Sequence, residues 1–266
     1  MLKRDAHIHT PFCPHGSTDS FEQYIEKAIK HHFTHISFTE HAPLPINFVD
    51  PTPAQDSGMQ FAHLERYFTT LSELKKAYAN DITISTGLEV DYIVNYELET
   101  TAFLNTYGSE LDDAILSVHF LQHRNTYTCI DYSAEEFMRF AKQIGSVQAV
   151  YDLYYETLQQ SILADLGAHK PTRIGHPTLV HKFQLAHGEH IDDDAAIRKI
   201  LQLMQQHGYE LDVNSAGLAK RDCLEQYPPK QYVAYAQSLG IPLVFGSDAH
   251  TANDLHQFYD DVFAAR

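Results

Sequence analysis

Cysteine is scarce in this sequence, and the three that occur are far apart. Cys13, Cys129 and Cys223 form no Cys-x-x-Cys pair and are odd in number, so neither a disulfide framework nor a thiolate zinc site is predicted. We interpret Cys13 as a small packing residue. No apolar run is long enough to cross a bilayer, and the first residues lack the apolar core of a secretory signal. We therefore expect a cytoplasmic protein with reduced thiols and no membrane partner.

Positive charge is also scarce. Lysine and arginine number 19 against 35 aspartates and glutamates, which gives a formal net charge of −16. Such a chain is poorly suited to bind a polyphosphate backbone, so no nucleic-acid partner is expected. Histidine, in contrast, is abundant, with 18 residues. A chain rich in His, Asp and Glu but poor in Cys favours metals with nitrogen and oxygen ligands, namely Zn, Mn, Fe or Co.

Short apolar runs alternate with longer amphipathic stretches along the chain, without a repeat or a linker. This alternation is typical of βα units around a parallel sheet, here in a single domain spanning 1–266. Strands are predicted at Leu2–His9, His35–Thr39, Ile82–Glu89, Ala114–His119, Thr172–Gly175, Glu210–Val213 and Pro242–Gly246. Helices are predicted at Phe21–His32, Phe61–Asn80, Tyr96–Tyr107, Ala134–Ile144, Gln148–Gly167, Asp194–His207 and Lys230–Leu239.

Seven strands with intervening helices predict an α/β fold, a (β/α) barrel with one unit fewer than the common eight. A doubly wound open sheet is the alternative, but no G-x-G-x-x-G or P-loop precedes a helix, so its nucleotide-binding form lacks a signature.

Asp19, with Glu22 three residues later, predicts a capping box at the first helix. Segment 42–58 is rich in proline, too long for a simple connection, and predicts a functional loop.

Side chains of the types that ligate metals lie at the ends of most predicted strands. His7 and His9 are two apart on the first strand and project to the same face. The motifs FTEH, GLEVD, SVH, RIGHP and GSDAH place similar groups at later strand ends. Barrel chemistry is built at the C-terminal ends of strands, so these residues predict one site there. The candidate ligands are His7, His9, His15, His41, Glu89, His119, His176, Asp248 and His250. We expect six other histidines to be solvated: His31, His32, His187, His190, His207 and His256.

This ligand set predicts phosphate ester hydrolysis. One catalytic zinc commonly takes about three protein ligands, so nine groups suit three divalent ions with a carboxylate bridging two of them. Two metals about 3.5–4 Å apart are the usual apparatus for hydrolysing phosphate esters. We expect a phosphate monoester to dock its phosphoryl oxygens on the metals. A hydroxide shared by two metals would then attack phosphorus in line and release inorganic phosphate.

The residues also carry a family resemblance. In order along the chain, HIHTPFCPHG, FTEH, GLEVDY, SVH, IGHP and GSDAH resemble the motifs of the polymerase-and-histidinol-phosphatase (PHP) family. The stretches PFCPHGS, EHAPLP, RIGHPTLVHKF and DVNSAGL resemble its histidinol-phosphate phosphatase branch. The resemblance implies a distorted (β/α)7 barrel with a trinuclear metal centre. It also implies hydrolysis of L-histidinol phosphate to L-histidinol and phosphate in histidine biosynthesis.

Carried over by motif, the resemblance assigns each ligand to a metal. The first metal takes His7, His9 and Asp248, the second takes His119 and His176, Glu89 bridges these two, and the third takes His15, His41 and His250. The candidate catalytic residues are then Glu89, Asp248 and His250. Asp248, His250 or a water on the third metal would protonate the leaving group, and the sequence leaves this choice open. One departure is Ala219, where a basic residue is expected and Lys220 comes one position later.

Substrate contacts are less sharply predicted. Ser117 shares a strand face with His119, so we expect it to face the site. The other candidates for substrate binding are Asn214 and the basic residues Lys182, Lys220 and Arg124. For the ammonium and imidazole of the substrate, the 42–60 loop and the third strand offer Phe48, Asp50, Asp56, Asp91 and Tyr92.

Three alternatives use the same residues. A PHP-type nuclease needs a basic groove, against which the net charge of −16 argues. A PHP-type phosphoesterase could act on another small phosphate ester or on a nucleotide. A non-catalytic metal-binding domain is the third, and the complete ligand set argues against it.

Overall fold

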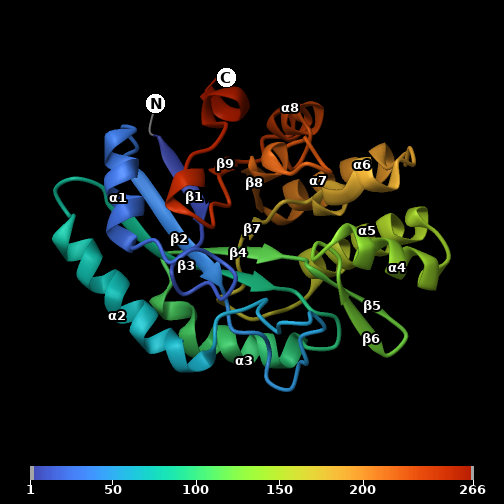
Figure 1. Ribbon diagram of the computed structural model, residues 1–266, viewed down its shortest axis with the longest axis horizontal. Coiled ribbons are helices and arrows are strands. Elements are labelled where there is room, and N and C mark those ends of the chain that lie inside the picture. Colours follow the sequence, from blue (N-terminus) through green and yellow to red (C-terminus); the bar gives the residue numbers. More distant parts are fainter. Residues whose placement is uncertain (1–2, 265–266) are drawn as a thin grey trace.

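The computed structural model describes residues 3–264. Its core is one seven-stranded parallel sheet in the order β1-β2-β3-β4-β7-β8-β9 (Figure 1). The strands are β1 (Arg4–Ile8), β2 (His35–His41), β3 (Thr83–Asp91), β4 (Asp113–Ser117), β7 (Arg173–Ile174), β8 (Glu210–Asn214) and β9 (Leu243–Gly246). Each predicted strand is present, with ends that differ by one or two residues; Leu2 lies outside the described residues. Neighbouring strands follow chain order, as right-handed βα units produce.

The sheet curls until its first and last strands meet. Ile8 and Ala249 form a parallel bridge. The His9 amide donates to the Ala249 carbonyl at 3.0 Å, and the Asp248 amide donates to the His7 carbonyl at 2.8 Å. This seam lies at the C-terminal ends of β1 and β9. The fold is therefore a nearly closed, distorted (β/α)7 barrel, and the prediction of a barrel over an open sheet is confirmed.

Helices surround the sheet because each buries one apolar face against it (Figure 1). They are α1 (Phe21–Lys30), α2 (Phe61–Ala77), α3 (Glu97–Tyr107), α4 (Ala134–Ile144), α5 (Val147–Leu163), α7 (Asp194–His207) and α8 (Lys230–Ser238). The predicted cap of α1 is wrong by one residue. Ser20 is the N-cap, and its amide donates to the Gln23 side chain at 2.6 Å. Among residues 3–264, no helix combines the length and apolarity needed to span a bilayer.

Several short elements of the structure were not predicted. An antiparallel hairpin of β5 (Phe120–His123) and β6 (Thr126–Cys129) follows β4. A short turn of helix, η2 (Leu179–Phe183), leads directly into α6 (Gln184–His187). The hairpin is anchored by ring contacts of Phe48 with Phe120 and Tyr127, at centroid distances of 5.0 and 5.1 Å. These contacts hold the 42–60 loop beside the open end of the barrel.

One of the histidines expected at the surface is buried. His256 is 7% exposed, stacks on Phe33, and places Nδ1 2.8 Å from Asp5 Oδ2. The other Asp5 oxygen accepts from the Ser247 amide at 3.0 Å, so Asp5 joins β1 to the residues after β9. The prediction that His256 is solvated is therefore wrong, because the buried carboxylate of Asp5 provides a hydrogen-bond partner inside the protein. His31, His32, His190 and His207 are exposed, and His187 is partly exposed.

Candidate active site

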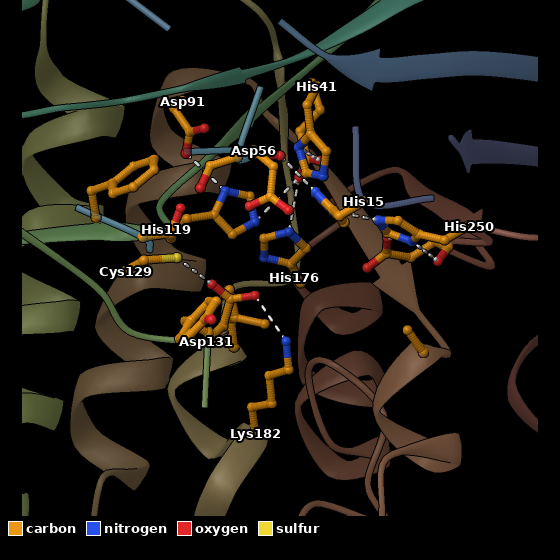
Figure 2. A pocket seen from close by; sticks show the side chains of 18 of the residues that line it. His15, His41, Asp56, Asp91, His119, Cys129, Asp131, His176, Lys182 and His250 are labelled. Atoms are coloured by element: carbon orange, nitrogen blue, oxygen red, sulfur yellow. Dashed lines mark hydrogen bonds and ion pairs between the residues drawn. The ribbon is translucent and has the colours of Figure 1, made fainter. Parts of the chain in front are cut away.

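The nine predicted ligands meet at the C-terminal end of the barrel. Eight of them lie in the last three residues of a strand or within four residues after it, and His15 lies in the loop after β1. Figure 2 shows His41, His119, His176, His15 and His250 around one pocket. His7 and His9 lie deeper and are fully buried. The side chains that were expected to converge at the strand ends therefore lie together, and their role as metal ligands stays a prediction.

Glu89 stands at the centre of the cluster, on β3 with 1% of its surface exposed. Its Oε2 lies 3.1 Å from His41 Nδ1 and 3.3 Å from His7 Nε2. Its Oε1 lies 2.9 Å from His176 Nε2 and 3.8 Å from His119 Nε2. The two oxygens of one carboxylate thus face two different sets of imidazoles, which is the arrangement a bridging ligand requires.

The donor atoms also fit bound cations. His7 Nε2, His41 Nδ1 and Glu89 Oε2 are buried and lack a hydrogen-bond partner among the described residues. Each such atom costs about 1–3 kcal/mol unless something satisfies it. Four overlapping groups place one donor atom per residue within 4.8 Å of the others: His7-His9-Glu89, Glu89-His119-His176, His7-His176-Asp248 and His9-Cys13-His41-His250. This donor set suits divalent metal ions, zinc among them.

The protonation of the cluster follows from its charges. Burial would raise the pKa of Glu89, but the nearby imidazoles, His7 foremost, hold it well below its usual range. Asp248 behaves in the same way, because His7 and His9 outweigh its burial. Burial and the neighbouring His9 instead lower the pKa of His250 and leave its imidazole neutral. The neighbouring carboxylates outweigh burial and raise the pKa of His7, and that of His9 to about 9, so these two imidazoles would release a proton when they ligate a metal.

Three carboxylates orient the candidate ligand imidazoles from behind, a role that the sequence did not predict for them. Asp212 Oδ2 lies 2.8 Å from His7 Nδ1, and Asp91 Oδ1 lies 2.7 Å from His119 Nδ1. Glu40 Oε1 lies 3.2 Å from His9 Nδ1. Such carboxylates fix the imidazole tautomer and raise its basicity as a ligand. Glu40 precedes His41 in FTEH and Asp212 lies in DVNSAGL, but nothing in their spacing predicts these contacts.

We expect Asp212→Asn to weaken metal binding about 10–100-fold, the usual effect of removing such a carboxylate. The fold should survive, because the amide retains the size of the side chain. Chelator competition with zinc measures the change. Asp81→Asn, at an exposed position, is the matched control. Equal zinc affinity in the Asp212 and Asp81 variants would contradict the role of Asp212.

Local backbone strain accompanies two of the ligands. Asp248 has a φ of 51° and His176 a φ of 25°, in or near the left-handed region. Such conformations cost about 1–3 kcal/mol and persist where the surroundings hold them. Asn214 helps to hold Asp248, because its Nδ2 donates to Asp248 Oδ2 at 3.2 Å. Gly246 permits the close packing behind them, since a Cβ there would lie 2.7 Å from the His7 Cβ.

The cluster opens into a pocket of about 370 Å³. Lys182 and Lys220 line it together with several candidate metal ligands, among them His119, His176 and Asp248. Lys182 Nζ donates to Asp131 Oδ2 at 2.9 Å, and Cys129 Sγ donates to the other Asp131 oxygen at 3.1 Å (Figure 2). Burial lowers the pKa of Lys182, but Asp131 outweighs it and keeps this lysine cationic. The pocket therefore combines positive charge with the donor cluster, as a phosphate site requires.

Three other residues that were predicted to contact the substrate, Ser117, Asn214 and Arg124, do not line the pocket. Ser117 is fully buried and donates to Glu89 Oε1 at 2.6 Å, so it orients Glu89. Asn214 orients Asp248 and Asp212 in the same manner. Arg124 is exposed at the tip of the β5–β6 hairpin, and its prediction as a substrate contact finds no support in this position. Of the five residues Ser117, Asn214, Lys182, Lys220 and Arg124, the two lysines line the pocket.

The 42–60 loop covers one side of the pocket through Thr52, Asp56 and Ser57. The Asp56 carbonyl accepts a hydrogen bond from His15 Nδ1 at 2.8 Å. Asp50, by contrast, is buried and accepts from the Thr52 and Ser57 amides, so it shapes the loop. The other residues considered for substrate recognition serve internal contacts: Phe48 in its ring cluster, Asp91 on His119, and Tyr92, which donates to Glu97.

Cys13 is buried as expected, with its sulfur near His9, His41 and His250. Burial and the negative charge of Glu40 raise the pKa of its thiol. Its burial fits the packing role expected from the sequence.

Comparison with known proteins agrees with this geometry. The model of the PHP domain matches residues 5–216. The histidinol-phosphatase of Bacillus subtilis (strain 168) is 49% identical over 264 residues, which cover 98% of each chain. HisK of Listeria monocytogenes, for which a histidinol phosphatase function has been suggested, superposes with a TM-score of 0.93 at 41% identity and covers 97% of this chain and 99% of its own.

A histidinol phosphate phosphatase from Lactococcus lactis shares the fold at lower identity. Its structure, complexed with zinc, L-histidinol and phosphate, has a TM-score of 0.74 at 20% identity and covers 99% of this chain and 94% of its own. The domain match and the full-length similarity to the Bacillus enzyme establish the family. This chain belongs to the PHP family.

Proposed function

We propose that this chain is a histidinol-phosphatase, which hydrolyses L-histidinol phosphate to L-histidinol and inorganic phosphate in histidine biosynthesis. Full-length similarity to the Bacillus enzyme supports this activity, and the Lactococcus relative holds both products. Within this molecule, the observation that carries the proposal is Glu89, whose two oxygens face separate sets of imidazoles in a pocket with two lysines. The three cysteines are buried and unpaired, which suits action in the cytoplasm.

We infer that the site holds three divalent ions. Zinc is the best-supported metal, because the Lactococcus relative contains it, and Mn, Fe and Co suit the same donors. When bound, these ions would neutralise phosphoryl oxygens and lower the pKa of the attacking water. The assignment that we propose gives His7, His9 and Asp248 to one ion, His119 and His176 to a second, Glu89 to both, and His15, His41 and His250 to a third.

The side chains around the donor cluster bind and orient the substrate. Lys182 and Lys220 bring positive charge to the phosphoryl oxygens, and Asp131 holds the Lys182 ammonium in the pocket. Asp248 and His250 lie beside the pocket after β9, and their lowered pKa values leave them ionised and neutral, respectively. They would therefore orient a water, the third proton source that the sequence allows, to protonate the leaving oxygen. The acidic net charge favours approach of a substrate that carries an ammonium and an imidazole.

We expect L-histidinol phosphate to have the highest kcat/KM in a panel of sugar phosphates, nucleotides and serine phosphate. An analogue of similar shape without the amine should be at least about a hundredfold worse, because a site built for the ammonium leaves its own polar groups unpaired. Phosphate release by metal-loaded protein measures both ratios.

A different ranking would decide between the two phosphatase functions. If a neutral sugar phosphate or a nucleotide gave the higher kcat/KM, the histidinol phosphate assignment would be wrong. The protein would then be a PHP-type phosphoesterase for that other small ester.

A further inference from the structure

A buried histidine outside the metal centre is held between two carboxylates. His181 lies in η2 and is 7% exposed. Its Nε2 lies 2.7 Å from Asp193 Oδ2, and its Nδ1 lies 3.0 Å from Glu225 Oε1. The Tyr155 hydroxyl also donates to Asp193, and the Tyr151 ring stacks on the imidazole. Both ring nitrogens donate only when the imidazole is cationic, so this geometry fits an imidazolium between two carboxylates.

His181 connects two segments that line the substrate pocket. η2 carries Lys182, whose ammonium enters the pocket beside Asp131. Glu225 belongs to the segment 215–229, between β8 and α8, which carries Lys220 and other lining residues. α6, which continues η2, packs on segment 215–229, because the Leu185 amide and the Gln184 side chain donate to the carbonyls of Asp222 and Cys223. η2, α6 and segment 215–229 thus form one unit. The His181–Glu225 contact adds a charged link to this unit.

We propose that His181 is a positioning residue for the phosphatase reaction. As a cation it fixes segment 215–229 against η2 and thereby sets the placement of Lys220 relative to Lys182. The two lysines then meet the phosphoryl group together, while the metal donors are held by other elements. This inference rests on the proposed function only for the identity of the substrate.

The charge of His181 gives the link a pH dependence. Burial lowers its pKa, but the hydrogen bonds and charges of Asp193 and Glu225 outweigh burial and raise it from 6.5 to about 9. Besides these two acids, the groups that face it are Tyr151 and Tyr155 on α5 and His187 on α6. Because the folded-state pKa is raised, the link is complete below pH 6.5 and is lost as the pH rises through about 9.

Glu225→Gln and His181→Gln test the link. The Glu225 side chain is 34% exposed, so its variant should fold even if the His181 variant does not. For Glu225→Gln we expect KM for L-histidinol phosphate to rise about tenfold with kcat changed less than about twofold, because phosphate contacts act in the ground and transition states alike. The alkaline rise in KM should move to lower pH, since one of the two acids that raise the His181 pKa is gone.

Two further measurements separate positioning from a general loss of structure. His187→Gln is the matched control: this histidine touches Tyr151 as His181 does but lies in α6, and KM should stay unchanged. Hydrogen exchange of the 215–229 amides should quicken in both test variants and not in the control. The dissociation constant of inorganic phosphate, from calorimetry on metal-loaded protein, should rise as KM does.

Clear results would overturn the proposal. One is a folded Glu225→Gln protein with wild-type KM, pH profile and exchange. Another is faster exchange at 215–229 with no change in KM or in phosphate affinity, which would make the link merely structural. If the wild-type protein did not hydrolyse L-histidinol phosphate, the proposed function would fail, while exchange and phosphate affinity would still decide the role of His181.

Discussion

Glu89→Gln should lower kcat for L-histidinol phosphate by on the order of a thousandfold while the barrel remains folded. The amide keeps the size of the side chain but removes the negative charge that faces His7 and His41 on one side and His176 on the other. Bound cations would lose their shared anionic ligand, so occupancy should fall together with turnover. Steady-state kinetics and elemental analysis of the same preparation measure both losses, and circular dichroism checks the fold.

Glu73→Gln, on the exposed face of α2, is the matched control for this experiment. It removes one carboxylate far from the cluster and should leave kcat and metal content unchanged. Near-normal turnover in the Glu89 variant would mean that this buried acid has a structural role, and the assignment of a bridging ligand would be wrong.

Removal of divalent metals should abolish turnover and lower the melting temperature. The donor cluster leaves buried nitrogen and oxygen atoms without partners, and bound cations satisfy them. A ligand at a thousandfold excess over its Kd stabilises the folded state by about 4 kcal/mol. Dialysis against a chelator, followed by thermal melting and activity assays before and after addition of zinc, measures both effects.

The metal count is tested on protein purified without chelator. By the usual number of ligands per site, about three ions should be bound per chain. Full activity in chelated protein would refute metal-dependent hydrolysis altogether. If the protein were fully active with two ions per chain, metal-dependent hydrolysis would still be supported, but our proposal of a third metal site would be wrong.

The convergence of the candidate metal donors could be predicted from the sequence for a geometrical reason. Consecutive parallel strands end at the same edge of a barrel, so residues as distant as His7 and Asp248 could be placed together from their positions after apolar runs. The side-chain partners could not be predicted in this way. Glu40, Asp91 and Asp212 reach behind the imidazoles, and which histidine each one meets depends on the twist and register of the sheet.

The pocket lining was harder to predict than the donors. Lys182 enters it from the short helix η2 and Lys220 from segment 215–229, whereas Arg124 looked equivalent in the sequence but is exposed at the tip of a hairpin. The β5–β6 hairpin itself has short strands, so its alternation was too brief to detect. His256 shows the same limit, because its burial depends on Asp5, a residue 251 positions away.

The seam between β1 and β9 has a consequence for biosynthesis of the protein. His7 and His9 stand on one side of it and Asp248 and His250 on the other, so the donor cluster joins the two ends of the sheet. While the ribosome is still making the chain, the first histidines lack the acid that completes their site. In the assignment that we propose, loading of the ion held by His7, His9 and Asp248 therefore follows the emergence of β9. Nascent chains interrupted before that strand would carry an incomplete centre even if their earlier βα units had already formed.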